Sequence, residues 1–467
     1  MNESQKIALR LVLLVLIGSL LSFVPVANSV TEKTLKLQSA FSADDYQKQA
    51  EILVSLAEET PWWKALWESA GDAAYLAGDY DLAKTAFEHA DQQGILSDQG
   101  RFKLGEVFLK VGEQDSAEDI WQEFGNNPAA VEKLANLYQD QGNYAAAVEE
   151  WQTYLSLNEN EVSVDKLYHI GLITAAHEPD QALVYLDQAI DTNPAAGVIS
   201  EAIRGSLSEE SAYQFVTTGQ ALASIGEWRL ASHAFEKAAN LRPDYLETWA
   251  YWGEALQHLE DPSRDPLEIL EKALAVDDRS PLVNMFLGLY WQREGSHDKA
   301  LDYFGKTEQA WPDHPDVYVE QGRSLAALGE LETAVEKFQQ AIELNHLDAT
   351  YYSQLASFCI TYSYQVRERG LPAARLAVQF DGQDPEILDV MGQVLLDLDD
   401  EMNALKFFQR ALEADSSYAP AYFHLGIIYS ARDNNELAIY YLQQVMLYSD
   451  NLSLIDRAER LLSSYLP

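Results

Sequence analysis

The side chains that most often carry catalysis or bind metals are present in this chain, but they are not grouped in the patterns that such chemistry needs. The nine histidines are scattered, and none falls in the H-E-x-x-H spacing that places two zinc ligands on one helix face. The G-x-x-x-x-G-K-[ST], G-x-S-x-G and G-x-G-x-x-G motifs do not occur. Acidic pairs such as Glu149–Glu150 and Asp399–Asp400 are expected at this composition, and we interpret them as solvated. The sequence therefore predicts a protein that is not an enzyme and that uses no cofactor or metal.

The net charge limits the possible partners. The chain has 74 acidic and 32 basic residues, which gives a formal charge of -42. A field of this sign repels phosphate backbones and anionic lipid surfaces, so nucleic acid is excluded as a partner. Two interpretations of the acidity remain open: the carboxylates solvate a large helical surface, or they steer a basic partner and bind cations loosely.

The chain has one cysteine, Cys359, which excludes any disulfide within the chain. Its neighbours in LASFCITYS are mostly apolar or small. This context predicts a buried packing role, and a reactive thiol is the alternative.

The amino-terminal segment has the pattern of an export signal. Lys6 and Arg10 precede an apolar run over residues 11–24, and small residues at Ala27 and Ser29 predict cleavage before Val30. The run is shorter than the roughly 20 apolar residues of a spanning helix. A cleaved signal within residues 1–29 is therefore favoured, with an uncleaved membrane anchor over residues 8–27 as the alternative. Either way, we expect the rest of the chain to lie outside the cytoplasm.

A small residue recurs along the chain with a period close to 34. Five of the ten steps between copies are 34 residues, three are 35 or 36, and the other two are 30 and 48. Such a period predicts stacked supersecondary units. This reference column consists of Gly71, Gly105, Ala135, Gly171, Gly219, Gly253, Gly288, Gly322, Ala356, Gly392 and Gly426.

Two further columns keep the same register and predict a pair of helices in each unit. Most copies have an alanine twelve residues after the reference position and a large apolar residue sixteen residues after it. We expect the alanine to lie opposite the reference glycine across the turn, as Ala83 would lie opposite Gly71. Apolar residues recur three or four apart on both sides of a turn such as AGDYD or LGEL, as expected for two amphipathic helices. The large residues are Phe87, Trp121, Trp151, Phe235, Phe304, Phe338, Phe408 and Leu442.

These columns resemble the tetratricopeptide repeat, whose pattern is W-x2-L-G-x2-Y, then A-x3-F, then P. The fifth copy matches it at Phe215, Gly219, Ala231, Phe235 and Pro243. The resemblance covers residues 61 to about 450. It implies an all-α fold, namely a right-handed superhelical solenoid of about eleven helix-turn-helix units.

The register also predicts the organisation of the chain. We expect a leading helical cap over residues 30–60, repeats 1–4 over 61–194 and repeats 5–11 over 211–450. Residues 195–210 lie outside the register and predict an irregular insertion or a hinge, and residues 451–467 predict a capping helix. Repeat four lacks a residue, repeat six has an extra one, and repeat nine runs through ITYSYQVRERGLP without the alanine of its column.

The resemblance implies that the first helix of each pair lines a concave groove. Residues six and three before the reference glycine, and one and four after it, would then face the groove, with the fifth after it at the rim. Leu282, Met285 and Leu289, with Val319 beside them, would form an exposed apolar strip, which is typical of interaction sites. Tight coiling that buries this strip is the alternative. The predicted partner-binding residues are Tyr213, Val216, Gln220, Leu282, Met285, Leu289, Arg293, Val319, Arg323, Phe423 and Ile427.

The charges at these positions indicate the kind of partner. Members of the family that clamp an acidic peptide terminus use basic groove residues, whereas this chain offers mostly acids, with Arg293 and Arg323 as exceptions. We therefore predict a protein-protein interaction scaffold that binds a basic or mixed apolar segment. The alternative is a cell-envelope assembly or polysaccharide-export accessory that recognises glycan with Tyr75, Tyr213 and Trp291.

Overall fold

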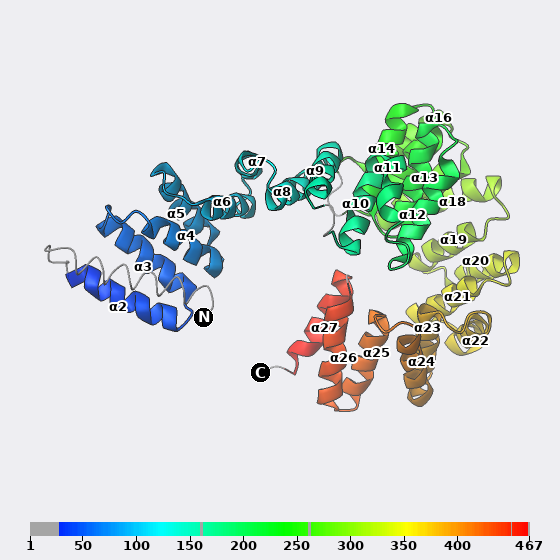
Figure 1. Ribbon diagram of the computed structural model, residues 1–467. Coiled ribbons are helices and arrows are strands. Elements are labelled where there is room, and N and C mark those ends of the chain that lie inside the picture. The colour runs from blue at the N-terminus through cyan, green and yellow to red at the C-terminus, as the bar shows by residue number, and fades with distance from the viewer. Residues whose placement is uncertain (1–27, 159–161, 260–262, 450, 466–467) are drawn as a thin grey trace. The chain divides into compact units, whose positions relative to one another are not determined.

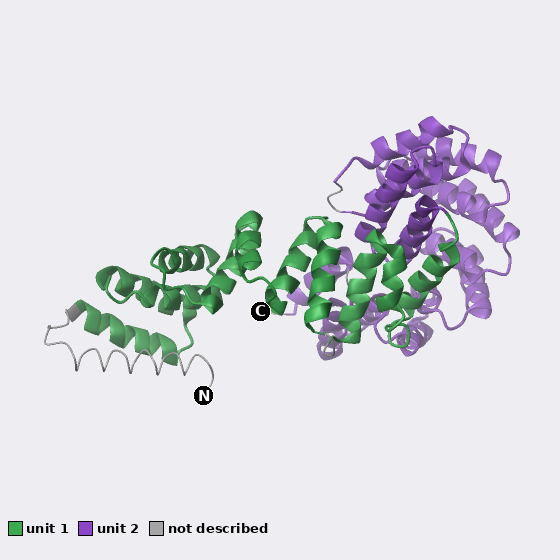
Figure 2. Cartoon of the chain, turned by 45° about the horizontal axis from the view of Figure 1, so that its top comes forward, with its two compact units in different colours: residues 1–209 green, residues 210–467 purple. Residues whose placement is uncertain are grey.

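The computed structural model describes residues 28–158, 162–259, 263–449 and 451–465. These residues form 26 α-helices, one π-helical turn and no strand, and they divide into two compact units at residue 209 (Figures 1 and 2). The predicted all-α solenoid of helix pairs is therefore confirmed. The predicted signal or anchor lies almost wholly outside the described residues. Among the described helices, none combines the length and the apolar character that crossing a membrane requires.

Unit 1 begins with two helices that precede the first repeat. Four helix pairs follow, and one more helix ends the unit. Its helices are α2 (Asn28–Ser42), α3 (Tyr46–Glu59), α4 (Leu66–Ala77), α5 (Tyr80–Gln92), α6 (Asp98–Lys110), α7 (Gln114–Glu123), α8 (Pro128–Asp140), α9 (Tyr144–Leu157), α10 (Val164–His177), α11 (Pro179–Leu186) and α12 (Pro194–Ser206). The segment predicted as an insertion or hinge is thus largely helix α12, and hinge motion stays a prediction.

Unit 2 contains the remaining seven repeats and a last helix, α27. In repeat nine the second helix begins with a π-helical turn. The elements are α13 (Ser211–Ser224), α14 (Trp228–Leu241), α15 (Leu246–Gln257), α16 (Pro266–Val276), α17 (Pro281–Arg293), α18 (His297–Ala310), α19 (Pro315–Ala327), α20 (Leu331–Leu344), α21 (Ala349–Thr361), η1 (Val366–Gly370), α22 (Leu371–Phe380), α23 (Pro385–Asp397), α24 (Glu401–Ala414), α25 (Ala419–Ala431), α26 (Asn435–Tyr448) and α27 (Leu452–Ser463).

Local signals explain where the helices begin and end. Gly78 ends α4 with φ of 79°, a left-handed conformation that glycine adopts without a steric penalty. Asp79 then caps α5, because its carboxylate accepts a hydrogen bond from the backbone N–H of Leu82. Proline stands in the first turn of α23 after the capping residue Asp384, where its missing N–H leaves no bond unmade.

The reference glycines allow the two helices of a repeat to approach closely. A β-carbon at Gly71 would lie 2.5 Å from Cδ1 of Phe87, which is the large residue sixteen positions later. The partner of this glycine is therefore Phe87 and not Ala83, which we had expected across the turn. An aromatic ring fills the space that the absent side chain leaves, so the glycine and the ring form one packing unit.

The interval between the glycine and the large residue that it contacts differs in the irregular repeats. In repeat four, Gly171 faces Leu186, fifteen residues later, and in repeat six Gly253 faces Leu270, seventeen residues later. These intervals confirm the predicted loss and gain of one residue. The packing contact is conserved in space although its spacing in the sequence changes.

Within unit 2 the stack of repeats curves (Figure 1). The first helices of successive repeats contact one another, as α15 does with α17 and α19 does with α21, whereas the second helices do so less. Because the repeats are closer together on the side of the first helices, that side lies inside the curve. The first helices of unit 2 are α13, α15, α17, α19, α21, α23 and α25.

Candidate partner-binding surface

The exposed rows of the first helices are shifted from those predicted. Except for the partly buried Met285, side chains three residues before the reference position are buried in unit 2: Val216 is 3% exposed, Val319 5% and Phe423 2%. The prediction that these three line an open groove is therefore wrong. Val319 belongs to the same buried cluster as Tyr351 of α21, so this row packs against the neighbouring first helix.

The surface that faces solvent keeps three of the predicted positions, which lie six residues before, one after and five after the reference glycine, and adds the position two residues before it. We define the first-helix face as the side chains six and two residues before, and one and five residues after, the reference glycine of each repeat in unit 2. On a helix with 3.6 residues per turn these four positions fall within about 60° of one another. Tyr213, Gln220, Leu282, Leu289, Arg293, Arg323 and Ile427 lie on this face.

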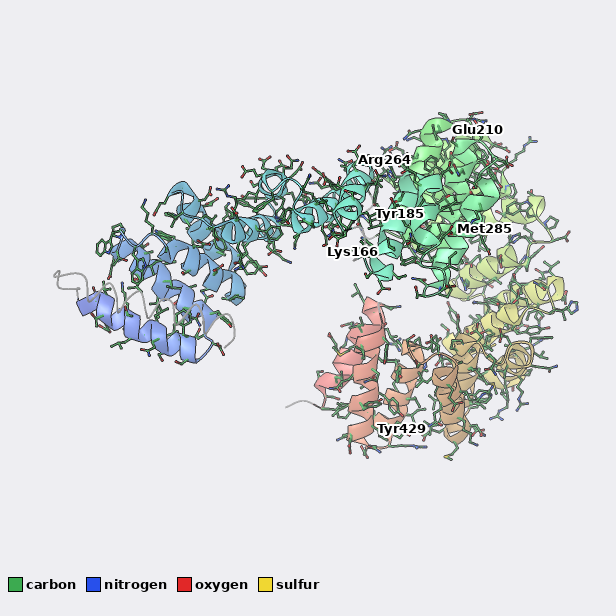
Figure 3. The ribbon with its side chains drawn as sticks, viewed as in Figure 1. Lys166, Tyr185, Glu210, Arg264, Met285 and Tyr429 are labelled. Carbon is green, nitrogen blue, oxygen red and sulfur yellow. The ribbon has the colours of Figure 1, made fainter. Side chains whose placement is uncertain are left out.

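The predicted apolar strip is only partly exposed. Leu282 packs against the cluster that includes Val283 and Leu287. Met285 and Leu289 of α17 pack against the cluster of Phe304, and Met285 is labelled in Figure 3. The strip therefore contributes mainly to the contacts between repeats, while its edges reach the surface. Tyr213, by contrast, is 42% exposed.

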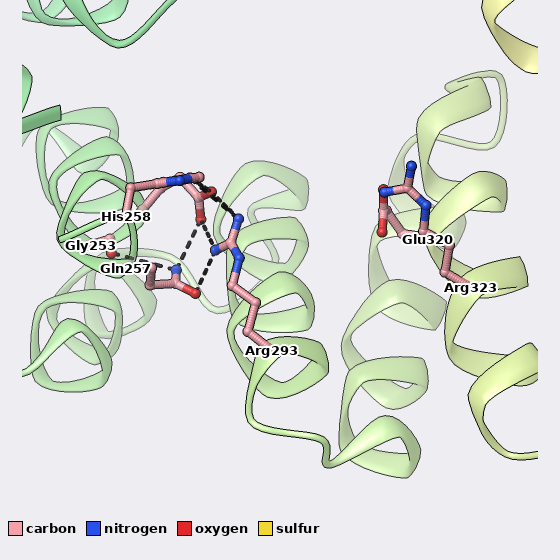
Figure 4. Close-up of polar contacts among 7 residues, drawn as sticks. Gly253, Gln257, His258, Arg293, Glu320 and Arg323 are labelled. Atoms are coloured by element: carbon pink, nitrogen blue, oxygen red, sulfur yellow. Dashed lines mark hydrogen bonds and ion pairs between the residues drawn. The ribbon is translucent and has the colours of Figure 1, made fainter. Parts of the chain in front are cut away.

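A polar cluster joins the first helices of repeats six and seven (Figure 4). Arg293 donates from Nη2 to Oε1 of Glu254 at 2.7 Å and from Nη1 to Oε2 at 3.1 Å. Nη1 also donates to Oε1 of Gln257 at 2.7 Å, and Nε2 of His258 lies 3.1 Å from Oε1 of Glu254. A bidentate arginine–carboxylate pair is geometrically specific, so this cluster fixes α17 against α15.

The environment of Glu254 determines its charge. Burial raises the pKa of this carboxyl, but the hydrogen bonds from His258 and Arg293 outweigh burial, and the pKa is lowered from its ordinary value. The imidazole of His258 also stacks on Trp228 of α14, with ring centroids 3.6 Å apart and planes at 6°. The cluster therefore connects three successive repeats around an ionised carboxylate.

A second polar cluster continues along repeats seven to nine. Gln292 donates from Nε2 to the backbone oxygen of Glu320 at 3.1 Å and to Oγ of Ser324 at 2.9 Å. Arg323 donates to Oε1 of Glu320 at 2.8 Å and to Oε1 of Gln354 at 2.7 Å. These bonds join α17, α19 and α21.

Glu320 is the least satisfied carboxylate in this cluster. Its side chain is nearly buried, and Oε2 has no hydrogen-bond partner among the described residues. Burial raises the pKa of Glu320. Burying a carboxylate oxygen without a hydrogen bond is unfavourable, and a hydrogen-bond donor or a cation beside it would remove that cost. The position of Glu320 therefore attracts positive charge.

Unit 1 uses a related arrangement with different residues. Asp72 of α4 pairs with Lys103 of α6 at 2.6 Å, and Glu106 of α6 pairs with Lys133 of α8 at 2.6 Å. Each acid lies one residue after the reference position of its repeat, and each lysine lies two residues before the reference position of the following repeat. Lys166 of α10, which is labelled in Figure 3, pairs with Glu132 of α8. In unit 1, therefore, lysines of the first helices neutralise the acids there.

The first helices of unit 2 contain no lysine. The six lysines of this unit all lie on second helices: Lys237, Lys272, Lys299, Lys306, Lys337 and Lys406. Arg293 and Arg323 are the two arginines of its first helices, and both already bind carboxylates. Asp389, three residues before Gly392, is buried beside His424. The acids on the first-helix face are Glu247, Glu254, Asp316, Glu320, Glu386 and Asp397. The first-helix face of unit 2 is thus acidic and offers no free cation.

The aromatic residues considered for glycan binding are mostly engaged. Tyr75 donates from its hydroxyl to Glu106 at 2.7 Å, and burial with this contact raises its pKa to about 12. Lys299 lies 3.6 Å from the ring centroid of Trp291 and covers that face. Tyr213 is the most accessible of the three. Among the described residues there is also no group of three or more metal-binding side chains.

Comparison with known proteins identifies the repeats. Residues 287–349, which include α18 and α19, match the family described as "Tetratricopeptide repeat". The chain contains tetratricopeptide repeats. Proteins built from tetratricopeptide repeats are typically non-catalytic scaffolds, and the fold therefore suggests protein–protein interaction.

A curated relative also contains tetratricopeptide repeats. The "TPR repeat-containing protein YpiA" of Bacillus subtilis (strain 168) is 22% identical over 264 residues, which are 49% of this chain and 62% of that protein. The chain thus covers less than two thirds of the length of this relative.

Solved tetratricopeptide repeat structures are similar at a low level. Yeast Tom70 is 13% identical with a TM-score of 0.46, and the match covers 93% of this chain and 96% of that one. The APC/C hetero-tetramer Cut9-Hcn1 is 14% identical with a TM-score of 0.43, and the match covers 95% of this chain and 97% of that one. MamA from Desulfovibrio magneticus RS-1 is 19% identical with a TM-score of 0.31, and the match covers 37% of this chain and 95% of that one. With these TM-scores below 0.5, the structures carry no argument about function.

Proposed function

We propose that this protein is a non-catalytic scaffold whose first-helix face, over repeats five to eight of unit 2, binds a basic or mixed apolar segment of a partner protein. The observation that carries the proposal is the distribution of charge. This face has an excess of carboxylates, and its two arginines are already bound to Glu254 and Glu320. An incoming lysine or arginine therefore meets acceptors and little competing positive charge.

The side chains available to a partner combine both kinds of contact. Glu247 and Asp316 supply carboxylates from α15 and α19, six residues before the reference glycines. The exposed ring of Tyr213 and the partly exposed Leu282 supply apolar surface on the same face. A segment that alternates cationic and apolar side chains would contact both.

The polar clusters support this proposal through rigidity. Glu254–Arg293 and Gln292–Glu320 hold α15, α17 and α19 in a fixed relation before any partner arrives. A preordered surface loses less conformational entropy on binding, which favours affinity. An extended segment can then bind across several repeats.

For location, we propose that the protein acts outside the cytoplasm, either secreted or held by residues 8–27. The amino-terminal sequence pattern supports this. Intact-mass analysis of protein purified from its natural host tests it: a chain that begins at Val30 indicates a cleaved signal. A full-length chain recovered from the soluble cytoplasmic fraction would contradict both forms.

Charge reversal on the first-helix face tests the binding proposal. The cationic probe is a fluorescein-labelled twelve-residue peptide with six lysines, four serines and two leucines. We expect the full chain to bind it, and Glu247→Lys/Asp316→Lys to weaken binding at least tenfold, because the variant removes two carboxylates and adds two cations.

The matched control places the same charges on second helices. Glu271→Lys/Asp302→Lys changes exposed residues of α16 and α18 and alters the net charge equally. We expect it to change binding less than threefold at 0.15 M salt, because exposed charges more than about 8 Å apart are largely screened. Equal loss in both variants, or binding of a glycan array in place of the peptide, would overturn the proposal.

A further inference from the structure

The π-helical turn of repeat nine is the most irregular backbone in unit 2. Ser363 has φ of 47° and Gln365 φ of 48°, and η1 follows directly. A residue other than glycine held at positive φ is strained and persists only where its surroundings fix it. The sequence also departs from the repeat pattern here, since ITYSYQVRERGLP lacks the alanine of its column.

Specific contacts hold this turn in place. Tyr364 donates from its hydroxyl to Oε2 of Glu332 at 2.6 Å, and Gln365 donates from Nε2 to the same oxygen at 3.3 Å. Val366 is buried in the core of unit 2, and Gly370 fits against Cys359, where a β-carbon would lie 3.0 Å from Cβ. The strained turn is therefore anchored on both sides and rigid.

The turn aligns two arginines. Arg367 lies in η1 and Arg375 in α22, eight residues later, and both are exposed. Two α-helical turns hold about 7.2 residues, and a π turn adds about one more. The two side chains therefore start from nearly the same side of the helix, about 11 Å apart along its axis.

These two arginines, like Arg279 and Arg369 of the same unit, have no hydrogen-bond or ion-pair partner for their guanidinium groups among the described residues. No hydrogen bond or ion pair joins either guanidinium to another described residue, whereas Arg242, Arg264 and Arg432 of the same unit all bind carboxylates. Leu376 and Phe380 of α22 are also exposed nearby in sequence. The second helix of repeat nine thus presents free cations to solvent.

We infer that the outer side of η1 and α22 is a second interaction surface, which binds an acidic segment of a partner protein through Arg367 and Arg375. Guanidinium groups bind carboxylates with two parallel hydrogen bonds, so each arginine can take one acidic side chain. About 11 Å corresponds to roughly three residues of extended chain, which sets the spacing of the two acids. The repulsion from the net charge acts weakly at this surface, because the Debye length is about 8 Å at physiological salt.

This surface is separate from the proposed first-helix face. It lies on a second helix and prefers the opposite charge, so one chain could hold a basic and an acidic segment at the same time. The inference does not depend on the function proposed above. The first-helix face is tested with the cationic probe, whereas this surface is tested with an acidic probe.

The test uses an acidic probe, in which the six lysines of the cationic probe are replaced by glutamates, and a neutral probe with glutamines. We expect the full chain to bind the acidic probe and not the neutral one. Arg367→Glu/Arg375→Glu should weaken that binding at least tenfold and leave binding of the cationic probe unchanged. Circular dichroism melts of the variants confirm that they are folded.

The control is Arg279→Glu/Lys406→Glu, which removes two exposed cations elsewhere in unit 2. We expect it to keep binding of the acidic probe within threefold. The inference is overturned if the full chain does not bind the acidic probe, if the neutral probe binds equally well, or if the control loses as much as the test variant.

Discussion

Gly288 lies against the ring of Phe304, and a β-carbon at that position would overlap Cε1 of the ring. Phe304 is completely buried, so the ring cannot move aside. We predict that Gly288→Ala destabilises the protein by about 1–3 kcal/mol, although alanine is the better helix former. Urea denaturation followed by circular dichroism measures the change.

Gly305 provides the matched control in the partner helix of the same repeat. It lies within α18, and a β-carbon there would have no neighbour within 4 Å. Gly305→Ala should therefore stabilise the protein by about 0.5–1 kcal/mol. Equal effects of the two substitutions would show that helix propensity, and not close packing, governs the glycine column.

The Glu254–Arg293 pair should make stability depend on pH. Because the pKa of Glu254 is lowered in the folded protein, its contribution is present above its unfolded pKa and is lost as pH falls through the folded pKa. Arg293→Met leaves the carboxylate buried, and we predict a loss of about 1–3 kcal/mol at pH 7. The loss should shrink as pH falls through the folded pKa of Glu254, because the carboxyl then becomes protonated.

An exposed ion pair serves as the comparison for this prediction. Arg460 and Asp456 form an exposed pair on α27, so Arg460→Met should produce no measurable change at either pH. If Arg293→Met is as harmless as this control, the polar cluster does not stabilise the contact between repeats six and seven.

Glu320 should behave in the opposite way. Burial raises its pKa, so the favourable contribution is present at low pH and is lost as pH rises through the folded value. Glu320→Gln removes the charge, keeps an oxygen for Arg323 and gives the unpartnered position a donor. We predict a higher melting temperature at pH 7 and a smaller difference at pH 4. A lower melting temperature at pH 7 would contradict the assignment of Glu320 as an unsatisfied buried carboxylate.

Cys359 should be unreactive in the folded protein. Its side chain is completely buried, and burial raises the pKa of the thiol to about 11. We predict no reaction with Ellman's reagent at pH 8 over minutes, and release of one equivalent after unfolding in urea. Rapid reaction of the native protein would mean that α21 opens beside the turn at Gly370.

The sequence predicted the helix pairs because the residues that specify them are local. The glycine and the large residue sixteen positions later belong to one repeat, so their spacing in the sequence predicts their contact. The loss of one residue before Leu186 and the gain of one before Leu270 could be predicted in the same way. The error at Gly71, where Ala83 was expected as the partner, arose because alanine and phenylalanine occupy the same face of the second helix.

The binding surface was predicted less well because it depends on how repeats stack. Val319 and Phe423 are buried once the repeats stack, and one sequence does not reveal how successive repeats stack. His258 and Glu320 were missed for the same reason, although their offsets from the reference glycines recur in every repeat. The π turn was visible only as the missing alanine of repeat nine, with no sign of its geometry.

The central claim is that a basic and apolar segment binds on the first-helix face of unit 2, and photo-crosslinking tests it most directly. Benzoylphenylalanine replaces Tyr213 of α13, which is exposed on that face, or Tyr440 of α26, which is exposed on a second helix. After irradiation with the cationic probe, we predict a crosslink at position 213 and none at position 440. A crosslink at position 440 alone, or equal crosslinking at both positions, would contradict the claim.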